Sequence, residues 1–306
     1  MLHHFPRAYD VYRSRGVGEF VRTLMTYAPI ELNNVLFRLQ HGGPTRVADE
    51  DWDTLIILDG CRYDMFSDQI GLEGTLESRI SAGSTSEEFL AQNFEEGVFH
   101  DTVYVNTNAY LPKLGFYEDQ TFHDVIDLLD EWDDTIDVVH PKTVVEAAQT
   151  AHDVYPNKRI IVHFMQPHYP FIGEFGQQIQ SQIDDRSVWR PLRDDPTVLS
   201  LSDVWKGYRE NLDIVLEHVS ELLDAIEGKI VISADHGNMV GERQSPVPTP
   251  KLYGHYWGVY SPQLVKVPWF IVESGERRTI KSEPPREETQ QSDALVEDRL
   301  EALGYK

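Results

Sequence analysis

The residues that could do chemistry are concentrated in four stretches that lie far apart in the sequence. Each stretch places Asp, His, Ser or Thr beside an apolar run or a helix start, and together they cover residues 54–64, 81–89, 163–170 and 234–255. Side chains at the carboxyl ends of neighbouring strands meet in the crevice where open α/β sheets bind ligands. The pattern therefore predicts one metal-dependent site that is assembled from all four stretches.

Three residues are predicted to bind the metal. Asp59 directly follows the apolar run 54–58, and the pair Asp235 and His236 follows the apolar run 229–233. Carboxylate oxygen together with imidazole nitrogen is a donor set that suits Zn or Mn better than Ca. The alternative for Asp59 is a helix N-cap, and the alternative for the pair is a solvated loop.

Three hydroxyl residues, Ser84, Thr85 and Ser86, stand in a row before a predicted helix at 86–94. A hydroxyl at a helix start lies among free backbone N–H groups, which stabilise an oxyanion or a phosphate. Beside a metal ion such a hydroxyl can also act as a nucleophile. On local sequence alone, a capping box, formed either by Thr85 with Glu88 or by Ser84 with Glu87, is the stronger interpretation.

Histidines supply the remaining candidates. His168 lies in a proline-containing loop just beyond the predicted strand at 159–164, which makes it a good candidate for the site. His255, flanked by glycine and aromatic residues, is a candidate metal ligand or a cationic contact for an anionic substrate. His163 lies inside the strand, and its default interpretation is a buried core histidine.

The bulk composition limits the possible partners and locations. The chain of 306 residues has a net charge of -24, which excludes nucleic acid as an expected partner because a polyanion would be repelled. High Asp and Glu with only 9 Lys against 18 Arg indicates a protein from a high-salt cytoplasm, the alternative being an ordinary acidic protein. The single Cys61 excludes an internal disulfide framework. Without an apolar run of about 18 residues or a signal-peptide pattern, we expect a cytoplasmic protein, either free or at the membrane face.

The elements that must position these residues follow an alternating pattern. Apolar runs predict strands at 54–58, 102–106, 159–164, 229–233 and 267–272. Helical spacing predicts helices at 62–70, 86–94, 124–132, 143–154 and 201–227. Continuous apolar strands that alternate with helices indicate a mostly parallel sheet with both faces covered. The expected fold class is therefore α/β, with a three-layer α/β/α arrangement.

Three parts of the chain are expected along the sequence. Residues 1–50 form a helical, locally basic extension, interpreted either as a helix that docks on a membrane surface or substrate, or as a packing extension, which we favour. Residues 51–273 form the catalytic domain, in which 173–200 is an irregular insertion or lid. Residues 274–306 form a polar mobile linker followed by a C-terminal helix.

The order and spacing of the motifs together resemble the alkaline phosphatase superfamily, in its sulfatase-like branch. The resemblance spans residues 52–272 and the tail 296–305, and the motifs are most similar to those of phosphoethanolamine transferases and lipoteichoic-acid synthases. It rests on Gly-Ser-Thr-Ser at 83–86, His-x4-His-x-Pro at 163–170, Asp-His-Gly at 235–237, Gly-Glu at 241–242 and the flanked His255. An alkaline-phosphatase-like fold is the expectation that follows.

The resemblance also implies roles for the residues. Asp59, Asp235 and His236 would bind a divalent metal, Zn or Mn, and Thr85 would complete the shell and attack phosphorus. His168 and His255 would act on the transferred group or hold a second metal. The residues implied to bind substrate are Arg62, Ser84 and His163. The nucleophile could instead be Ser84 or Ser86, because three hydroxyls stand in a row.

The implied function is a metal-dependent phosphohydrolase or phosphotransferase that acts on phosphate esters of a small molecule, a glycan or a lipid headgroup. The Cys-x-Pro-Ser-Arg or Ser-x-Pro-Ser-Arg motif of sulfatases is absent, and Phe164 stands where two-metal members carry an Asp. Transfer onto a lipid would require peripheral membrane contact through residues 1–50. The alternatives are a sulfuric ester hydrolase and a catalytically silent protein that binds an anionic ligand.

Overall fold

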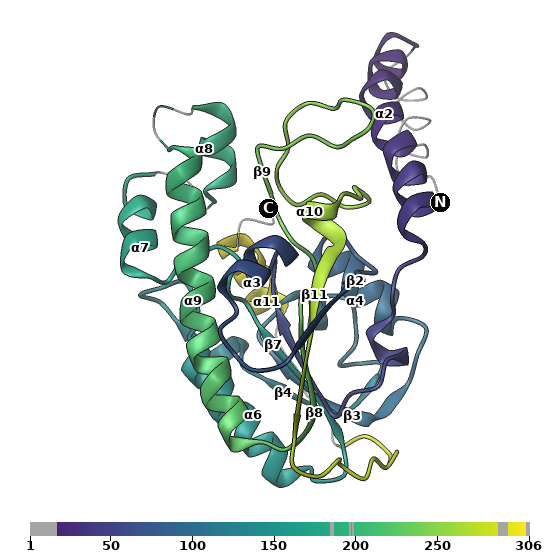
Figure 1. Ribbon diagram of the computed structural model, residues 1–306, viewed down its shortest axis with the longest axis vertical. Coiled ribbons are helices and arrows are strands. Elements are labelled where there is room, and N and C mark those ends of the chain that lie inside the picture. Colours follow the sequence, from purple (N-terminus) through teal and green to yellow (C-terminus); the bar gives the residue numbers. More distant parts are fainter. Residues whose placement is uncertain (1–16, 184–186, 196, 198, 287–292, 304–306) are drawn as a thin grey trace.

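A seven-stranded sheet forms the centre of the molecule. The computed structural model describes residues 17–183, 187–195, 197, 199–286 and 293–303 (Figure 1). Within these residues the sheet has the strand order β2-β11-β8-β1-β7-β3-β4. The strands are β1 (Thr54–Leu58), β2 (Thr75–Ile80), β3 (Phe99–Asn106), β4 (Phe122–Asp127), β7 (Arg159–Phe164), β8 (Gly228–Ser233) and β11 (Lys266–Ser274). Five neighbouring strands from β8 to β4 run parallel, whereas β11 is antiparallel to both β8 and β2.

Helices cover both faces of this sheet because its strands are apolar on both sides. In β1, Ile56 and Leu58 belong to one hydrophobic core, and Leu55 and Ile57 belong to the other. The first core includes residues of α3 (Tyr63–Gln69), α6 (Pro141–Val154) and α9 (Leu201–Ala225). The second includes residues of α4 (Ser86–Phe94), α5 (Tyr110–Lys113) and α11 (Asp293–Ala302). The predicted three-layer α/β/α fold with a mostly parallel sheet is therefore confirmed.

The helix predicted at 124–132 is wrong. Residues 122–127 form β4, which pairs with β3 through Tyr104 and Val125, and the short 3-10 helix Leu129–Glu131 follows. The apolar spacing fits a helix, but Val125 and Ile126 are β-branched and extend the sheet at its edge. Strand β2 was not predicted, because its residues are mostly half-exposed and carry no continuous apolar run.

The described residues of the region 173–200 include helices, whereas its composition predicts an irregular segment. It contains the helices α7 (Glu174–Gln180) and α8 (Trp189–Asp194), and α7 packs against α9. In Figure 1 these short helices lie beside the upper part of α9, at the end of the molecule where the parallel strands terminate.

The polar segment after β11 lies against the body of the protein. Arg277 pairs with Asp51 and Asp53 at 2.7 and 2.6 Å, and the Lys281 backbone N–H donates to the Asn157 carbonyl at 2.9 Å. These contacts differ from the mobile linker that its composition predicts. The predicted C-terminal helix is present as α11, while residues 287–292 and 304–306 lie outside the described residues.

Helix α2 (Val17–His41) is the described part of the N-terminal extension. Its Asn33 and Asn34 side chains donate to the backbone carbonyls of Val247 and Gly258, each at 2.7 Å. Its C-terminal half is therefore fastened to the segment that also carries His255. None of the described helices combines the length and apolar character that crossing a membrane requires.

Candidate metal centre

Asp59, Asp235 and His236 come together in a buried cluster, with one ligand atom from each lying within 4.8 Å of the others. Asp59 follows β1, and the other two follow β8, its parallel neighbour. Because parallel strands end at the same edge of a sheet, residues just past their ends share one crevice. All three side chains are fully buried.

Each carboxylate in the cluster has one bonded and one unbonded oxygen. Oδ1 of Asp235 accepts the backbone N–H groups of Gly60 and His236 at 2.9 and 2.7 Å, while its Oδ2 has no hydrogen-bond partner. Oδ2 of Asp59 accepts from Asn108 and Ser86, while its Oδ1 has no partner. A buried oxygen without a donor is costly, so both unbonded oxygens could serve as ligands for a cation.

The third donor is an imidazole nitrogen whose protonation is set by the backbone. His236 Nδ1 donates to the Gly237 carbonyl at 2.9 Å, since a carbonyl can only accept. Its Nε2 therefore presents a lone pair, 3.8 Å from Asp59 Oδ1 and 3.4 Å from Asp235 Oδ2. Two carboxylate oxygens and one imidazole nitrogen could together hold a divalent metal ion.

The two carboxyl groups respond differently to the shared site. Burial opposes ionisation of Asp59, but His163, His168 and His236 outweigh it and hold the pKa of this carboxyl below its usual range. Burial raises the pKa of Asp235, and the negative charge of Asp59 raises it further. A divalent cation between the two groups would stabilise the charged form of both carboxyls and so lower the pKa of each.

The three hydroxyls before α4 have separate positions. Ser86 Oγ lies 3.0 Å from Asp59 Oδ2 and 3.3 Å from His236 Nε2, so it touches the metal-ligating groups directly. Thr85 is the N-cap of α4, and its hydroxyl accepts from the Glu88 backbone N–H at 3.1 Å. Ser84 donates to the Glu88 carboxylate at 2.6 Å. The capping role inferred from local sequence is thus present, and Ser86 is the hydroxyl nearest to the cluster.

Glu88 fastens the hydroxyl loop to the segment 256–260. Its Oε2 accepts from Ser84 and from the Gly258 backbone N–H, and its Oε1 accepts from the Tyr260 hydroxyl at 2.5 Å. The loop also passes very close to the helix: a Cβ on Gly83 would lie 2.1 Å from the Phe89 nitrogen. Only glycine permits this approach, which sets the direction of the hydroxyl row.

Two buried groups hold Asp59 from the neighbouring strands. Asn108, two residues past β3, donates to Asp59 Oδ2 at 2.9 Å. His163 Nε2 lies 3.6 Å from the same oxygen, and His163 Nδ1 is bonded to Tyr104 at 2.8 Å. His163 is therefore a buried neighbour of the metal cluster, and its predicted contact with substrate stays a prediction. Asn108 was not predicted, although its position after a strand end was a readable signal.

His168 and His255 lie beside His236, at ring-centroid distances of 6.4 and 4.4 Å from it. Burial lowers the pKa of His168, and a water-poor setting together with His236 and His168 lowers the pKa of His255 well below its usual value. Neutral imidazoles suit a metal ligand or a proton acceptor better than a cationic contact. Asn238, which the sequence reading missed, accepts the Nδ1 proton of His255 at 2.9 Å and so fixes its tautomer.

Arg62 is placed in an ion-pair network within the protein. Its guanidinium binds Asp64 through two nitrogens, Glu242 at 2.6 Å and the Asn238 carbonyl at 3.0 Å. Burial opposes its charge, but these carboxylates raise the pKa of Arg62 above its usual value. The Arg62 side chain is thus bound by other groups of the protein, and a role in binding substrate stays a prediction.

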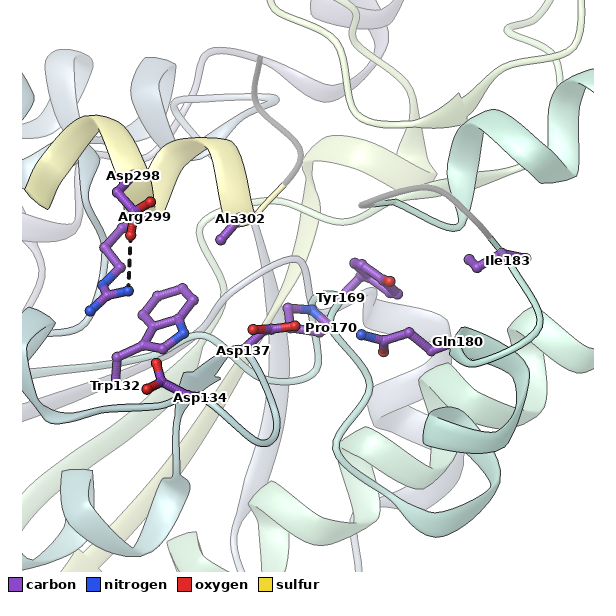
Figure 2. Close-up of a pocket in the computed structure, with 10 residues that line it drawn as sticks. All are labelled: Trp132, Asp134, Asp137, Tyr169, Pro170, Gln180, Ile183, Asp298, Arg299 and Ala302. Atoms are coloured by element: carbon purple, nitrogen blue, oxygen red, sulfur yellow. Dashed lines mark hydrogen bonds and ion pairs between the residues drawn. The ribbon is translucent and has the colours of Figure 1, made fainter. Parts of the chain in front are cut away.

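A cavity of about 450 Å³ lies beside the loop that carries His168 (Figure 2). Its lining includes Tyr169 and Pro170 from that loop and three carboxylates against a single arginine, Arg299, which pairs with Asp298 at 3.2 Å. The lining residues are Trp132, Asp134, Asp137, Tyr169, Pro170, Gln180, Ile183, Asp298, Arg299 and Ala302. This negative lining is unfavourable for a phosphate.

Comparison with protein-family models and with curated proteins finds no match to the sequence. Solved structures do match. The C-terminal periplasmic domain of EcEptC from Escherichia coli, in complex with Zn, aligns with a TM-score of 0.50 and 15% identity over 75% of each chain. The lipoteichoic acid synthase LtaP from Listeria monocytogenes aligns with a TM-score of 0.47 and 11% identity over 80% of this chain and 72% of that one.

A protein in the alkaline phosphatase superfamily from Vibrio parahaemolyticus also matches, with a TM-score of 0.42 and 10% identity over 81% of this chain and 69% of that one. At these identities the likeness concerns the fold, and the EcEptC domain carries it. The chain therefore has a fold similar to that of the EcEptC domain.

Proposed function

We propose that this protein is a metal-dependent phosphoric ester hydrolase or transferase whose nucleophile is a hydroxyl at the start of α4. The observation that carries the proposal is the convergence of two unbonded carboxylate oxygens and the His236 Nε2 lone pair beside that helix start. Phosphate esters of a small molecule, a glycan or a lipid headgroup are the substrate class that the motif resemblance supports.

A divalent cation held by Asp59, Asp235 and His236 would act as a Lewis acid, lowering the pKa of the hydroxyl and neutralising charge on the phosphoryl oxygens. We expect Zn or Mn, and the Zn in the similar EcEptC structure favours Zn. The free N–H groups of the first turn of α4 would bind a phosphoryl oxygen. The neutral imidazoles of His168 and His255 would accept a proton from water or from an acceptor hydroxyl in the second half of the reaction.

Two adjacent hydroxyls compete for the role of nucleophile. The motif resemblance favours Thr85, and its 9% exposure makes it the only one of the three that is not completely buried. The contacts favour Ser86, whose oxygen touches Asp59 and the ligating nitrogen of His236. We retain Thr85 as the proposed nucleophile and assign to Ser86 the role of orienting Asp59.

The test is turnover of p-nitrophenyl phosphate and bis-p-nitrophenyl phosphate by metal-loaded protein, with the phosphorylated residue mapped by peptide mass spectrometry after an acid quench. Thr85→Ala should lower kcat by at least about 100-fold and abolish the phosphopeptide. Ser86→Ala should lower activity less and keep the phosphate on Thr85. The exposed Ser181, the C-cap of α7, supplies the control, since Ser181→Ala removes a distant hydroxyl.

A phosphate mapped to Ser86 would overturn the residue assignment and keep the reaction class. Absence of turnover in protein that has bound metal would favour the silent binding protein. Release of sulfate from an aryl sulfate faster than phosphate from the matching ester would favour a sulfuric ester hydrolase.

A further inference from the structure

The outer face of α2 is the largest concentration of exposed apolar side chains among the described residues. Eight large hydrophobic residues are exposed among the described residues, and five of them lie on α2. They are Val21, Met25, Leu32, Val35 and Leu39, with exposures of 46, 74, 50, 41 and 79%. The exposed Ala28 completes a spacing of alternately four and three residues, which places all six on one face.

The opposite face of the same helix is already used. Ile30 and Phe37 are buried in a core shared with Val259 and Leu264, and Asn33 and Asn34 are bonded to the body. The outer stripe therefore has no further role in holding α2 on the protein. An apolar stripe of this length on a surface helix marks a binding face.

Charge identifies the surface that this face fits. Residues 1–46 contain six arginines and three acidic residues, whereas the whole chain has a net charge of -24. No exposed side chain of α2 is acidic among those that the structure describes. An amphipathic helix in a segment with an excess of arginine is typical of helices that bind in the interface of an anionic bilayer.

A second copy of the chain fits this face less well. A helix pair with this spacing is normally specified by opposite charges that flank the apolar seam. Arg38 lies over the Tyr260 ring, 4.8 Å from its centroid, so the described residues of α2 show no such charge pair beside the stripe.

We propose that the outer face of α2 docks this protein on the surface of an anionic lipid membrane. The docked helix would hold the segment 247–260, and with it His255, close to the bilayer, because Asn33 and Asn34 bind that segment. In Figure 1, α2 rises at the end of the molecule where the parallel strands terminate. Lipid headgroups would then lie near the segment that carries His255, although the docking itself does not depend on the proposed chemistry.

The test is flotation of the full chain with vesicles of phosphatidylcholine, with and without phosphatidylglycerol, at 0.2 M and 2 M KCl. We expect binding to the anionic vesicles, with part of it retained at 2 M salt because the apolar contact is not screened. Met25→Ser/Leu32→Ser/Leu39→Ser should weaken binding at least about 30-fold. The control Val98→Ser/Val154→Ser removes exposed apolar residues elsewhere and should leave binding unchanged.

Three results would overturn the proposal: wild-type protein that does not float, a triple variant that floats like wild type, or a vesicle-free dimer that the triple variant dissociates. The last result, read by light scattering after size exclusion, would assign the face to a second copy. Turnover of a soluble aryl phosphate should be the same in the triple variant and wild type. Failure of docking is therefore separable from failure of the proposed activity.

Discussion

At the residue scale, the site is defined by how each polar atom is used. Asp59 and Asp235 each keep one oxygen bonded to the protein and one oxygen without a partner, and the partners come from different elements. The bonded oxygens fix the orientation of each carboxylate, and the unbonded ones face a common point with His236. In metal sites, hydrogen bonds from neighbouring groups of this kind fix the orientation of the ligands.

Replacing Asp235 by Asn separates metal binding from folding. Asp235→Asn can still accept the Gly60 and His236 N–H groups through its amide oxygen, but it removes the negative charge that Asp59 repels. We expect less than one-tenth of the wild-type metal content and loss of turnover. Without metal, the variant should be at least as stable as wild type, because a buried carboxyl that resists ionisation has been removed.

The readouts are elemental analysis and thermal unfolding with and without Zn. Wild type should gain stability with increasing Zn, whereas Asp235→Asn should not. Asp68→Asn is the control, since Asp68 is a surface residue paired with Arg209. Equal Zn stabilisation in Asp235→Asn and wild type would remove Asp235 from the ligand set.

At the element scale, the segment that follows β11 packs where α6 meets the start of β1. His152 on α6 lies 3.1 Å from Thr54 Oγ1, at the start of β1, and 2.7 Å from Arg278 in that segment. Burial, reinforced by the charge of Arg278, lowers the pKa of His152 to about 3. The histidine is thus held neutral where a helix, a strand and the C-terminal segment meet.

This histidine should make stability depend on pH. Its folded pKa lies below its unfolded value, so the unfolded chain binds a proton first as the pH falls below 6.5. The contribution of His152 is complete above pH 6.5 and is lost progressively toward pH 3, with about 3 kcal/mol lost by pH 4.

Denaturant unfolding of wild type and His152→Gln at pH 7.5 and pH 4.5 measures this effect. Glutamine can bond to Thr54 but cannot titrate, so the variant should lose less stability between the two pH values. His218→Gln, at a half-exposed histidine on α9, is the control. Parallel losses in wild type and His152→Gln would show that other groups govern the acid response.

At the scale of the whole molecule, charge dominates. A net charge of -24 on one compact body repels itself at low ionic strength. Many carboxylates are paired only at the surface, as Asp194 is with Arg193, and such pairs stabilise little. The composition therefore predicts a protein that needs salt to remain folded.

The melting temperature should rise by at least about 10 °C between 0.1 M and 2 M KCl. The Debye length is the distance beyond which salt screens the repulsion between exposed charges. It falls from about 10 Å to about 3 Å as the salt rises from 0.1 to 1 M, so fewer carboxylates repel one another. Calorimetry in KCl measures this change, with an equal osmolality of sucrose as control. Sucrose stabilises folded proteins because it is excluded from their surface, but it does not screen charge. A melting temperature that is flat in KCl would contradict the high-salt interpretation of the composition.

Much of the architecture could be predicted because its signals are local. The strands β1, β7, β8 and β11 are continuous apolar runs, and α4 and α9 have helical spacing with a capping residue at their start. The three predicted metal ligands follow two such strands, and parallel strand ends converge by geometry. These features depend on short stretches of sequence and on a rule that applies to every parallel sheet.

The remainder depended on contacts between residues far apart in the chain. Only the packed structure shows that Ser86 reaches Asp59, that Arg62 is bound by Asp64 and Glu242, and that Asn108 supports the cluster. The misassigned β4 belongs to the same class, because its pairing with β3 overrode a helical pattern. The sequence by itself determined which residue types stand at the strand ends and helix starts, since periodicity and caps are local. Tertiary structure alone decided which polar atoms are consumed by protein partners and which remain for a ligand, because each such pairing joins segments that only folding brings together.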